Sequence, residues 1–230
     1  MTTIENTTAA TTTATNGRPP GSPWRRIGWW TMTLLIFVTL AVVSQYIGMN
    51  PANFLAQQRE VYLRRETMLA LHICGAATAL AIGPFQFLPR LRRGHARVHR
   101  ILGIAYLTSA TVGGVGGLGM APTAYTGLVA SLGFGTMGVL WLACTWTGFV
   151  MMMRHRFADH RRWMIRSFSL VLGGVTLRLV LGTYIALEGS VHSWLSFHTV
   201  YMATSWLCWV PNLLLALWLT RSRPGPPLHQ

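Results

Sequence analysis

Residues 97–121, RVHRILGIAYLTSATVGGVGGLGMA, join a basic stretch to an apolar segment that is long enough to cross a lipid bilayer. A spanning helix needs about 20 predominantly apolar residues, and no charged residue follows Arg100 before Ala121. Asp159-His160-Arg161-Arg162 leads into a second such segment in the same way. These two junctions predict helices that enter a membrane from basic loops.

Six segments of the chain satisfy this length rule. They are Ile27–Gly48, Thr67–Leu88, Ile101–Ala121, Gly127–Met153, Ser167–Leu187 and Trp194–Thr220, and they lack charged residues except for Arg178 in the fifth. The whole chain is 51% hydrophobic and only 10% charged, whereas soluble domains carry roughly 25% charged residues. The sequence therefore predicts an all-α polytopic membrane protein, a bundle of six transmembrane helices.

The membrane domain is expected to cover residues 24–220. Residues 1–23 are rich in Thr, Ala, Gly and Pro and lack apolar periodicity, which predicts a disordered cytoplasmic tail. Residues 221–230 contain three prolines and predict a second tail. The first apolar segment begins too far from Met1 and is too long for a cleavable signal peptide, so it is expected to be an anchor.

The basic residues, all of them arginines, predict the orientation of the bundle. They gather before span one, between spans two and three, between spans four and five, and after span six, whereas the alternate connections are poor in net positive charge. Because cationic loops are retained in the cytoplasm, we expect both termini to be cytoplasmic and the protein to be multi-pass in the cytoplasmic (inner) membrane. This placement at span ends makes membrane lipids the expected partners and excludes nucleic acid, despite the net charge of +14.

Small residues predict close packing in the third span. Five glycines lie between Gly113 and Gly119, in the small-xxx-small manner that lets two membrane helices approach closely. The glycine-rich surface of this span would also permit contact with a second copy of the chain, as a homodimer, or with a partner in a membrane complex. Pro84 and Pro211 are expected to kink their helices, which leaves backbone carbonyls for neighbours to satisfy.

Histidines form two groups at opposite faces of the predicted membrane domain. His72 and His198 lie on the outer side, and His99 and His160 lie at the inner boundary. Paired imidazoles on two helices are typical of haem b ligation, and they also serve in proton transfer. An interhelical hydrogen bond is the plain alternative for each of them.

Arg178 lies deep in the fifth span, where an arginine costs at least about 2.5 kcal/mol by insertion scales. It must therefore have a partner. The candidates nearest to it in membrane depth are Glu66, Glu188, Tyr184 and His72. One interpretation is a structural ion pair or carbonyl clamp. The other is a site for an anion or a polar head group, such as a phosphate, a haem propionate or a quinone oxygen.

Several motifs in spans two to six carry a family resemblance. They are Leu71-His72, Gly83-Pro84-Phe85-Gln86-Phe87, His99-Arg100 through Gly103 and Tyr106, Gly133-Phe134, Trp141, His160-Arg161-Arg162-Trp163-Met164-Ile165-Arg166-Ser167, Thr176-Leu177-Arg178 and Trp206-Leu207-Cys208-Trp209-Val210-Pro211-Asn212-Leu213. With these the chain resembles domain of unknown function 2306, a bacterial family of multi-pass membrane proteins. The resemblance implies a bacterial membrane location and supplies no established reaction.

Three functional hypotheses follow, in descending order. The first is a membrane redox protein of haem-b or quinone-reactive type, in which His72, His99, His160 and His198 ligate iron or carry protons while Arg166 and Arg178 hold the anionic part of the cofactor. The second is an enzyme acting on a lipid or isoprenoid substrate, with Arg178 on a polar group and Glu66 or Glu188 as the acid. The third is a non-catalytic carrier or accessory subunit.

Overall fold

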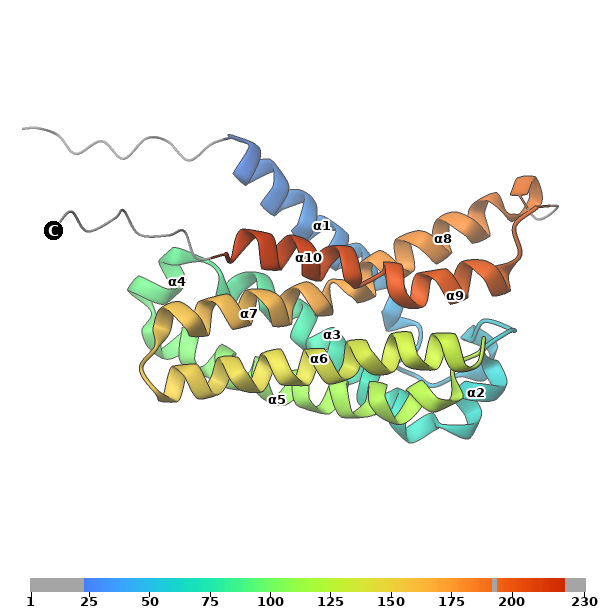
Figure 1. Cartoon of the computed structure of the whole chain (residues 1–230), viewed down its shortest axis with the longest axis horizontal. Coiled ribbons are helices and arrows are strands. Elements are labelled where there is room, and N and C mark those ends of the chain that lie inside the picture. Colours follow the sequence, from blue (N-terminus) through green and yellow to red (C-terminus); the bar gives the residue numbers. More distant parts are fainter. Residues whose placement is uncertain (1–22, 192–193, 222–230) are drawn as a thin grey trace, which may run out of the picture.

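The computed structural model describes residues 23–191 and 194–221 (Figure 1). Within these ranges all regular structure is helical, and six helical segments are long and apolar enough to cross a membrane. The predicted all-α, six-span bundle is therefore confirmed. Residues 1–22 and 222–230, which make up nearly all of the two predicted tails, lie outside the described residues.

The helices follow the predicted spans, with breaks in the last two. The elements are α1 (Pro23–Ser44), η1 (Pro51–Asn53), α2 (Arg59–Arg64), α3 (Glu66–Gln86), α4 (Pro89–Gly94), α5 (Ala96–Met120), η2 (Ala121–Thr123), α6 (Leu128–Met153), α7 (Phe157–Val171), α8 (Gly173–Val191), α9 (Phe197–Leu207) and α10 (Val210–Leu219). Spans one to four are α1, α3, α5 and α6. The fifth span consists of α7 and α8, and the sixth of α9 and α10.

The arginine-rich connections lie together. Figure 1 shows α4 and the α6–α7 turn at one end of the bundle, which we call the arginine-rich end. The opposite end carries α2, the end of α8 and the start of α9, and we call it the α2 end. The two loops on which the orientation depends thus share one side, and the assignment of that side to the cytoplasm stays a prediction.

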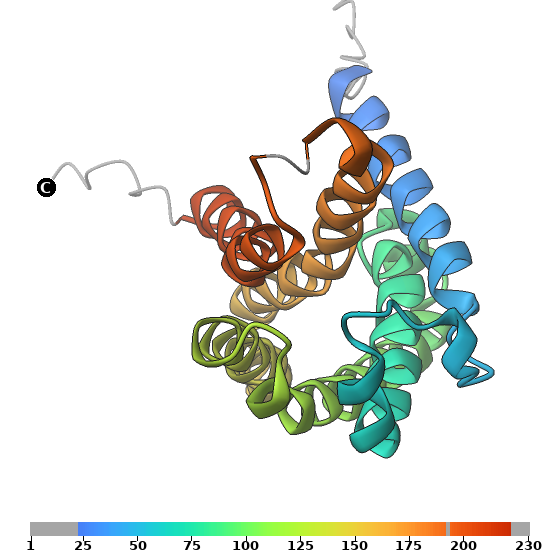
Figure 2. The same ribbon diagram turned by 90° about the vertical axis from the view of Figure 1, so that its right-hand side faces the viewer.

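The helices form a ring when the bundle is viewed from the α2 end (Figure 2). Neighbours in the ring touch in the order α1, α3, α5, α6, α9, α8, and α8 returns to α1. Helix α7 takes a different place: it packs on α6, α10 and α3, and its last residues, from Ser167 to Val171, are all buried. Hence the C-terminal part of α7 lies in the interior of the bundle.

The fifth span bends where α7 gives way to α8. Ordinary helical bonding ends at Leu172, whose carbonyl accepts hydrogen bonds from both the Val175 and the Thr176 amides, at 2.9 and 3.1 Å. The adjacent Gly173 and Gly174 make such a break easy, because paired small residues are a common cause of kinks. The span therefore leaves the interior at this point and joins the ring as α8. The predicted start at Ser167 is wrong, since the helix already begins at Phe157 in the basic loop.

Glycines bring α3 and α5 into backbone contact. A Cβ atom on Gly75 would lie 2.3 Å from the Gly113 nitrogen, and one on Gly116 would lie 2.5 Å from the His72 nitrogen. Any side chain at these positions would force the helices apart. The close packing predicted for the glycine-rich third span is confirmed.

Hydroxyl groups join three helices in the interior of the bundle. Ser167 Oγ on α7 lies 2.9 Å from the Tyr106 hydroxyl on α5 and 2.7 Å from Thr145 Oγ1 on α6. All three residues are buried. Thr145 Oγ1 also donates to the Trp141 carbonyl at 2.7 Å, so it accepts from Ser167 Oγ. Since a membrane interior offers no water to such groups, these bonds satisfy the hydroxyls.

The sixth span breaks before Pro211, as predicted. Helix α9 ends at Leu207 and α10 begins at Val210. Asn212 Nδ2 donates to the Cys208 carbonyl and to Thr176 Oγ1 on α8, each at 3.0 Å. A side-chain amide thus helps to satisfy the backbone at the break and ties it to the fifth span.

Candidate functional site

A cavity of about 380 Å³ occupies the interior of the ring towards the α2 end. Every helix of the ring contributes to its wall. Its deep end is formed by Trp141, Val171 and Cys208, which are all at most 5% exposed. The cavity exists because α7 occupies the interior only as far as the bend at Leu172. Beyond the bend, α8 lies in the ring and leaves the interior open.

The cavity has a polar upper part and an apolar lower part. Tyr46, Gln58, Tyr62, His72 and Arg178 line the part nearer the α2 end. Below His72 the walls are apolar, and Leu80 lies about 12 Å deeper on the helical rise of α3. The space therefore matches an amphipathic molecule with its polar group towards the α2 end.

Arg178 is the cation of this cavity. Its side chain folds back along α8, and Nη1 donates to the Gly174 carbonyl at 3.0 Å. No Asp or Glu forms an ion pair with it among the side chains that the structure describes. It interacts electrostatically with Tyr62, Tyr46 and His72. One carbonyl leaves most of the guanidinium donors to face the cavity.

His72 presents one ring nitrogen to the cavity. Its Nδ1 lies 2.9 Å from the Gly113 carbonyl oxygen, and since a carbonyl only accepts, Nδ1 carries the proton. The ring lies against Gly117, where a Cβ atom would be 2.9 Å from Nδ1. Glycine at 117 thus makes room for the ring, and Nε2 is left with a lone pair for a ligand.

The connection between α1 and α3 lines the polar part of the cavity through Gln58 and Tyr62. Phe54, 4% exposed, stacks on Tyr46 with ring centroids 5.9 Å apart and meets Tyr62 edge-on at 5.3 Å. It packs with Leu69 and Ile73 of α3. The Tyr62 hydroxyl donates to Gln58 Oε1. Burial raises the pKa of the Tyr62 phenol, while the nearby Arg178 opposes this shift in part.

The inner histidines lie near one another at the arginine-rich end. Each is the fourth residue of its helix, His99 in α5 and His160 in α7, and they are close enough to interact electrostatically. His160 Nδ1 donates to the Gly148 carbonyl at 2.8 Å. Nδ1 of His99 is buried and has no hydrogen-bond partner in the described part of the chain. Neither residue lines the cavity.

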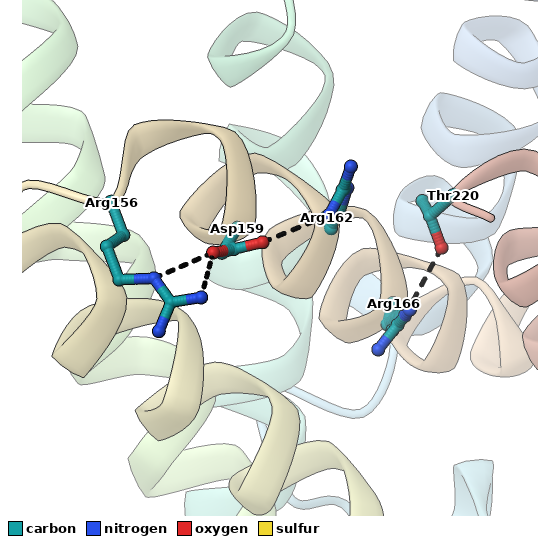
Figure 3. A network of polar contacts seen from close by, with 5 residues as sticks. All are labelled: Arg156, Asp159, Arg162, Arg166 and Thr220. Carbon is teal, nitrogen blue, oxygen red and sulfur yellow. Dashed lines mark hydrogen bonds and ion pairs between the residues drawn. The ribbon is translucent and has the colours of Figure 1, made fainter. Parts of the chain in front are cut away.

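Arg166 also lies away from the cavity, on α7. Its Nε donates to Thr220 Oγ1 at 3.2 Å, as Figure 3 shows, and its guanidinium carbon is 4.6 Å from the centre of the Trp163 ring. In the same view Asp159 pairs with Arg156 at 2.6 Å and with Arg162 at 3.1 Å. These contacts link α7 to α10 and to the turn that precedes α7.

The remaining candidates are not brought into the cavity. His198 is exposed, with its ring 6.2 Å from that of Tyr125, and it is not among the lining residues that contain His72. Glu66 is exposed in the first turn of α3. Glu188 falls in the last turns of α8, and its side chain lies outside the described residues. In the described ranges no group of three or more His, Cys, Asp or Glu is placed to hold a metal ion.

Sequence reasoning missed Gln58, Tyr62 and Tyr46. Gln58 and Tyr62 are four residues apart, the spacing that puts two side chains on one helix face, and both lie just outside a predicted span. Arg178, a buried cation in need of a partner, was the signal that could have led to them. The predicted candidate Tyr184 instead donates its hydroxyl to the Leu195 carbonyl at 3.1 Å.

The fold and this cavity define a multi-pass helical membrane protein with an internal cavity. Residues 69–220, well over half of the chain, match the family model described as "Predicted membrane protein (DUF2306)", and the chain belongs to this family. No curated protein and no solved structure gives a significant match. His72 and Arg178 lie inside the matched region, whereas Tyr46, Gln58 and Tyr62 precede it.

Proposed function

We propose that this protein binds an amphipathic membrane molecule in the cavity, with the molecule's head group on Arg178. The observation that carries the proposal is the guanidinium, which lines a cavity without a described carboxylate beside it. A charged side chain inside a membrane is expensive, and such residues mark binding sites by default. A head group that accepts hydrogen bonds would offset that cost.

The quinone-reactive form of the redox hypothesis uses this geometry directly. A quinone carbonyl accepts from Arg178, and a quinol hydroxyl can donate to Nε2 of His72, whose other nitrogen is fixed on Gly113. The apolar part of the cavity suits the remainder of such a molecule. His72 would then position the head group, and it is also the group able to take a proton from it.

Haem b fits the residues less well than a quinone does. Among the described lining residues the cavity offers one imidazole, that of His72. Its Nδ1 is bonded to the Gly113 carbonyl, as the second nitrogen of iron-bound histidines commonly is. Arg178 could pair with a propionate. His198, the expected second ligand, is outside the lining. His99 and His160 remain the better pair for a bis-histidine haem, because they interact across α5 and α7.

The lipid-enzyme and carrier hypotheses share the same binding step. No acidic side chain lines the cavity in the described chain, so Glu66 has no contact there that would make it the acid. A carrier or accessory subunit needs only the binding itself. All of these hypotheses therefore depend first on whether Arg178 binds a head group.

The test compares what co-purifies with wild-type protein and with Arg178→Met in a neutral detergent. We expect native mass spectrometry to find an amphipathic molecule on the wild type and to lose it in Arg178→Met. Arg162→Met is the matched control, a half-buried arginine whose partner is Asp159, away from the cavity. Equal ligand content in wild type and Arg178→Met, with both proteins folded, would refute the proposal.

A visible spectrum of the same preparations, oxidised and then dithionite-reduced, separates the cofactor classes. A Soret band lost in His160→Ala and kept in His72→Ala would favour haem at the arginine-rich end. A colourless wild-type preparation with bound quinone or lipid, released by Arg178→Met, would support the cavity site.

A further inference from the structure

Hydrogen-bond donors face the polar part of the cavity from two separate segments. Arg178 belongs to α8. Gln58, only 4% exposed, precedes α2 and lines the same cavity. Its Oε1 accepts from the Tyr62 hydroxyl, so the oxygen is occupied and the Nε2 amide is oriented by that bond. Nε2 has no partner among the described residues, and this leaves it as a second donor.

The charge of the cavity is unbalanced. None of its lining residues is Asp or Glu in the part of the chain that the structure describes. A neutral head group would leave the guanidinium without a counter-ion, whereas an oxyanion would supply one and would accept from both donors. Charge-assisted hydrogen bonds are roughly twice as strong as neutral ones.

The connection that carries Gln58 is held firmly over the cavity. Phe54 anchors it on Leu69 and Ile73 of α3, and Asn53 Nδ2 donates to the Gln45 carbonyl at 2.8 Å. The connection precedes the family match, which begins at residue 69. The donor on α8 therefore lies inside the matched region, and the donor on the connection lies outside it, although both line the same cavity.

Resting on the function proposed above, we propose that the cavity selects an amphiphile of medium chain length with an oxyanion head group, a carboxylate or a phosphate, and that Gln58 and Arg178 bind this group together. Gln58 then sets specificity from a segment outside the matched region. The apolar part, about 12 Å deep below His72, takes the chain.

Three probes with the same chain test this selection: decanoate, decyl phosphate and 1-decanol. Their dissociation constants are measured on full-length protein in a neutral detergent at neutral pH. We expect at least one anion to bind roughly tenfold more tightly than decanol. Gln58→Leu should weaken that anion roughly tenfold and leave decanol unchanged. Gln58→Glu should weaken it further, because the new carboxylate would occupy Arg178.

Gln57→Leu is the matched control, since Gln57 is the exposed neighbour and does not line the cavity. The tighter of the two anions identifies the head group as carboxylate or phosphate. Equal affinities for decanol and both anions would overturn the selection while leaving amphiphile binding in place. An equal loss of anion affinity in Gln57→Leu and Gln58→Leu would overturn the role of Gln58. A failure of all three probes to bind would overturn this inference, and the co-purification experiment would then judge the proposed function on its own.

Discussion

Replacing Gly75 with alanine should disturb both the stability of the bundle and the position of His72. The new Cβ would lie 2.3 Å from the Gly113 nitrogen and 2.6 Å from the Ser109 carbonyl oxygen. These are backbone atoms, which cannot rotate away. Since ordinary contact begins at 3.4 Å, α3 and α5 must separate locally by about 1 Å.

The size of the effect follows from that separation. Overpacking typically costs about 1–3 kcal/mol, and the upper part of that range applies where both sides are backbone. The hydrogen bond from His72 Nδ1 to the Gly113 carbonyl, now 2.9 Å, would lengthen beyond the normal range, which adds about 1 kcal/mol. We expect Gly75→Ala to lower the free energy of unfolding by about 3 kcal/mol.

Unfolding by SDS in mixed micelles, followed by tryptophan fluorescence, measures this change. Gly182→Ala is the control, because a Cβ on Gly182 of α8 meets nothing within 4 Å. It should raise stability by about 0.5–1 kcal/mol, the usual gain from Gly to Ala within a helix. Equal unfolding midpoints for Gly75→Ala and Gly182→Ala would refute the backbone contact between α3 and α5.

Three further perturbations have defined outcomes. Ser167→Ala removes the hydroxyl that lies 2.9 and 2.7 Å from its two partners, and we expect a loss of about 1–2 kcal/mol in the same SDS titration; an unchanged midpoint would contradict the network. Because burial raises the pKa of Tyr62 above its unfolded value, its stabilising contribution is complete below about pH 10 and falls as the pH rises further. The difference in melting temperature between wild type and Tyr62→Phe should therefore be constant up to about pH 9 and change between about pH 10 and 11; a constant difference throughout would contradict the burial. Single cysteines at Arg93 and Arg156, in a chain without its native cysteines, should react with an impermeant maleimide from the same face of the membrane; labelling from opposite faces would refute the bundle.

The six spans could be predicted because the membrane imposes a simple rule on the sequence. Each span needs a long uncharged segment, and the arginines at alternate connections separate one span from the next. The bend in the fifth span could not be predicted in the same way. Gly173 and Gly174 sit in an uninterrupted apolar run, and whether such a pair bends depends on what packs there: Met137 and Trp209 lie within 3.3 Å of a Cβ on Gly173.

Single residues of the candidate site could be predicted from the sequence, but their arrangement around one cavity could not. Arg178 and His72 stand out because polar side chains are rare inside spans, and both line the cavity. The pairing of His72 with His198 rested on equal depth in the membrane, which says nothing about the side of the bundle that each residue faces. Gln58 and Tyr62 reach the cavity because Phe54 packs the connection onto α3, and the sequence does not reveal this contact between distant residues.

A single bend thus accounts for the cavity, its closed end and the placement of its cation. From Ser167 to Val171 the fifth span lies in the interior, and beyond Gly173 it belongs to the ring, so the internal space begins there. Arg178 follows Gly174 by one helical turn and donates to its carbonyl, which directs the guanidinium along the wall of that space. A straight fifth helix would fill the cavity and leave the arginine no room for a ligand. The proposed binding depends on this bend, because the bend leaves the space open beside the two proposed head-group donors.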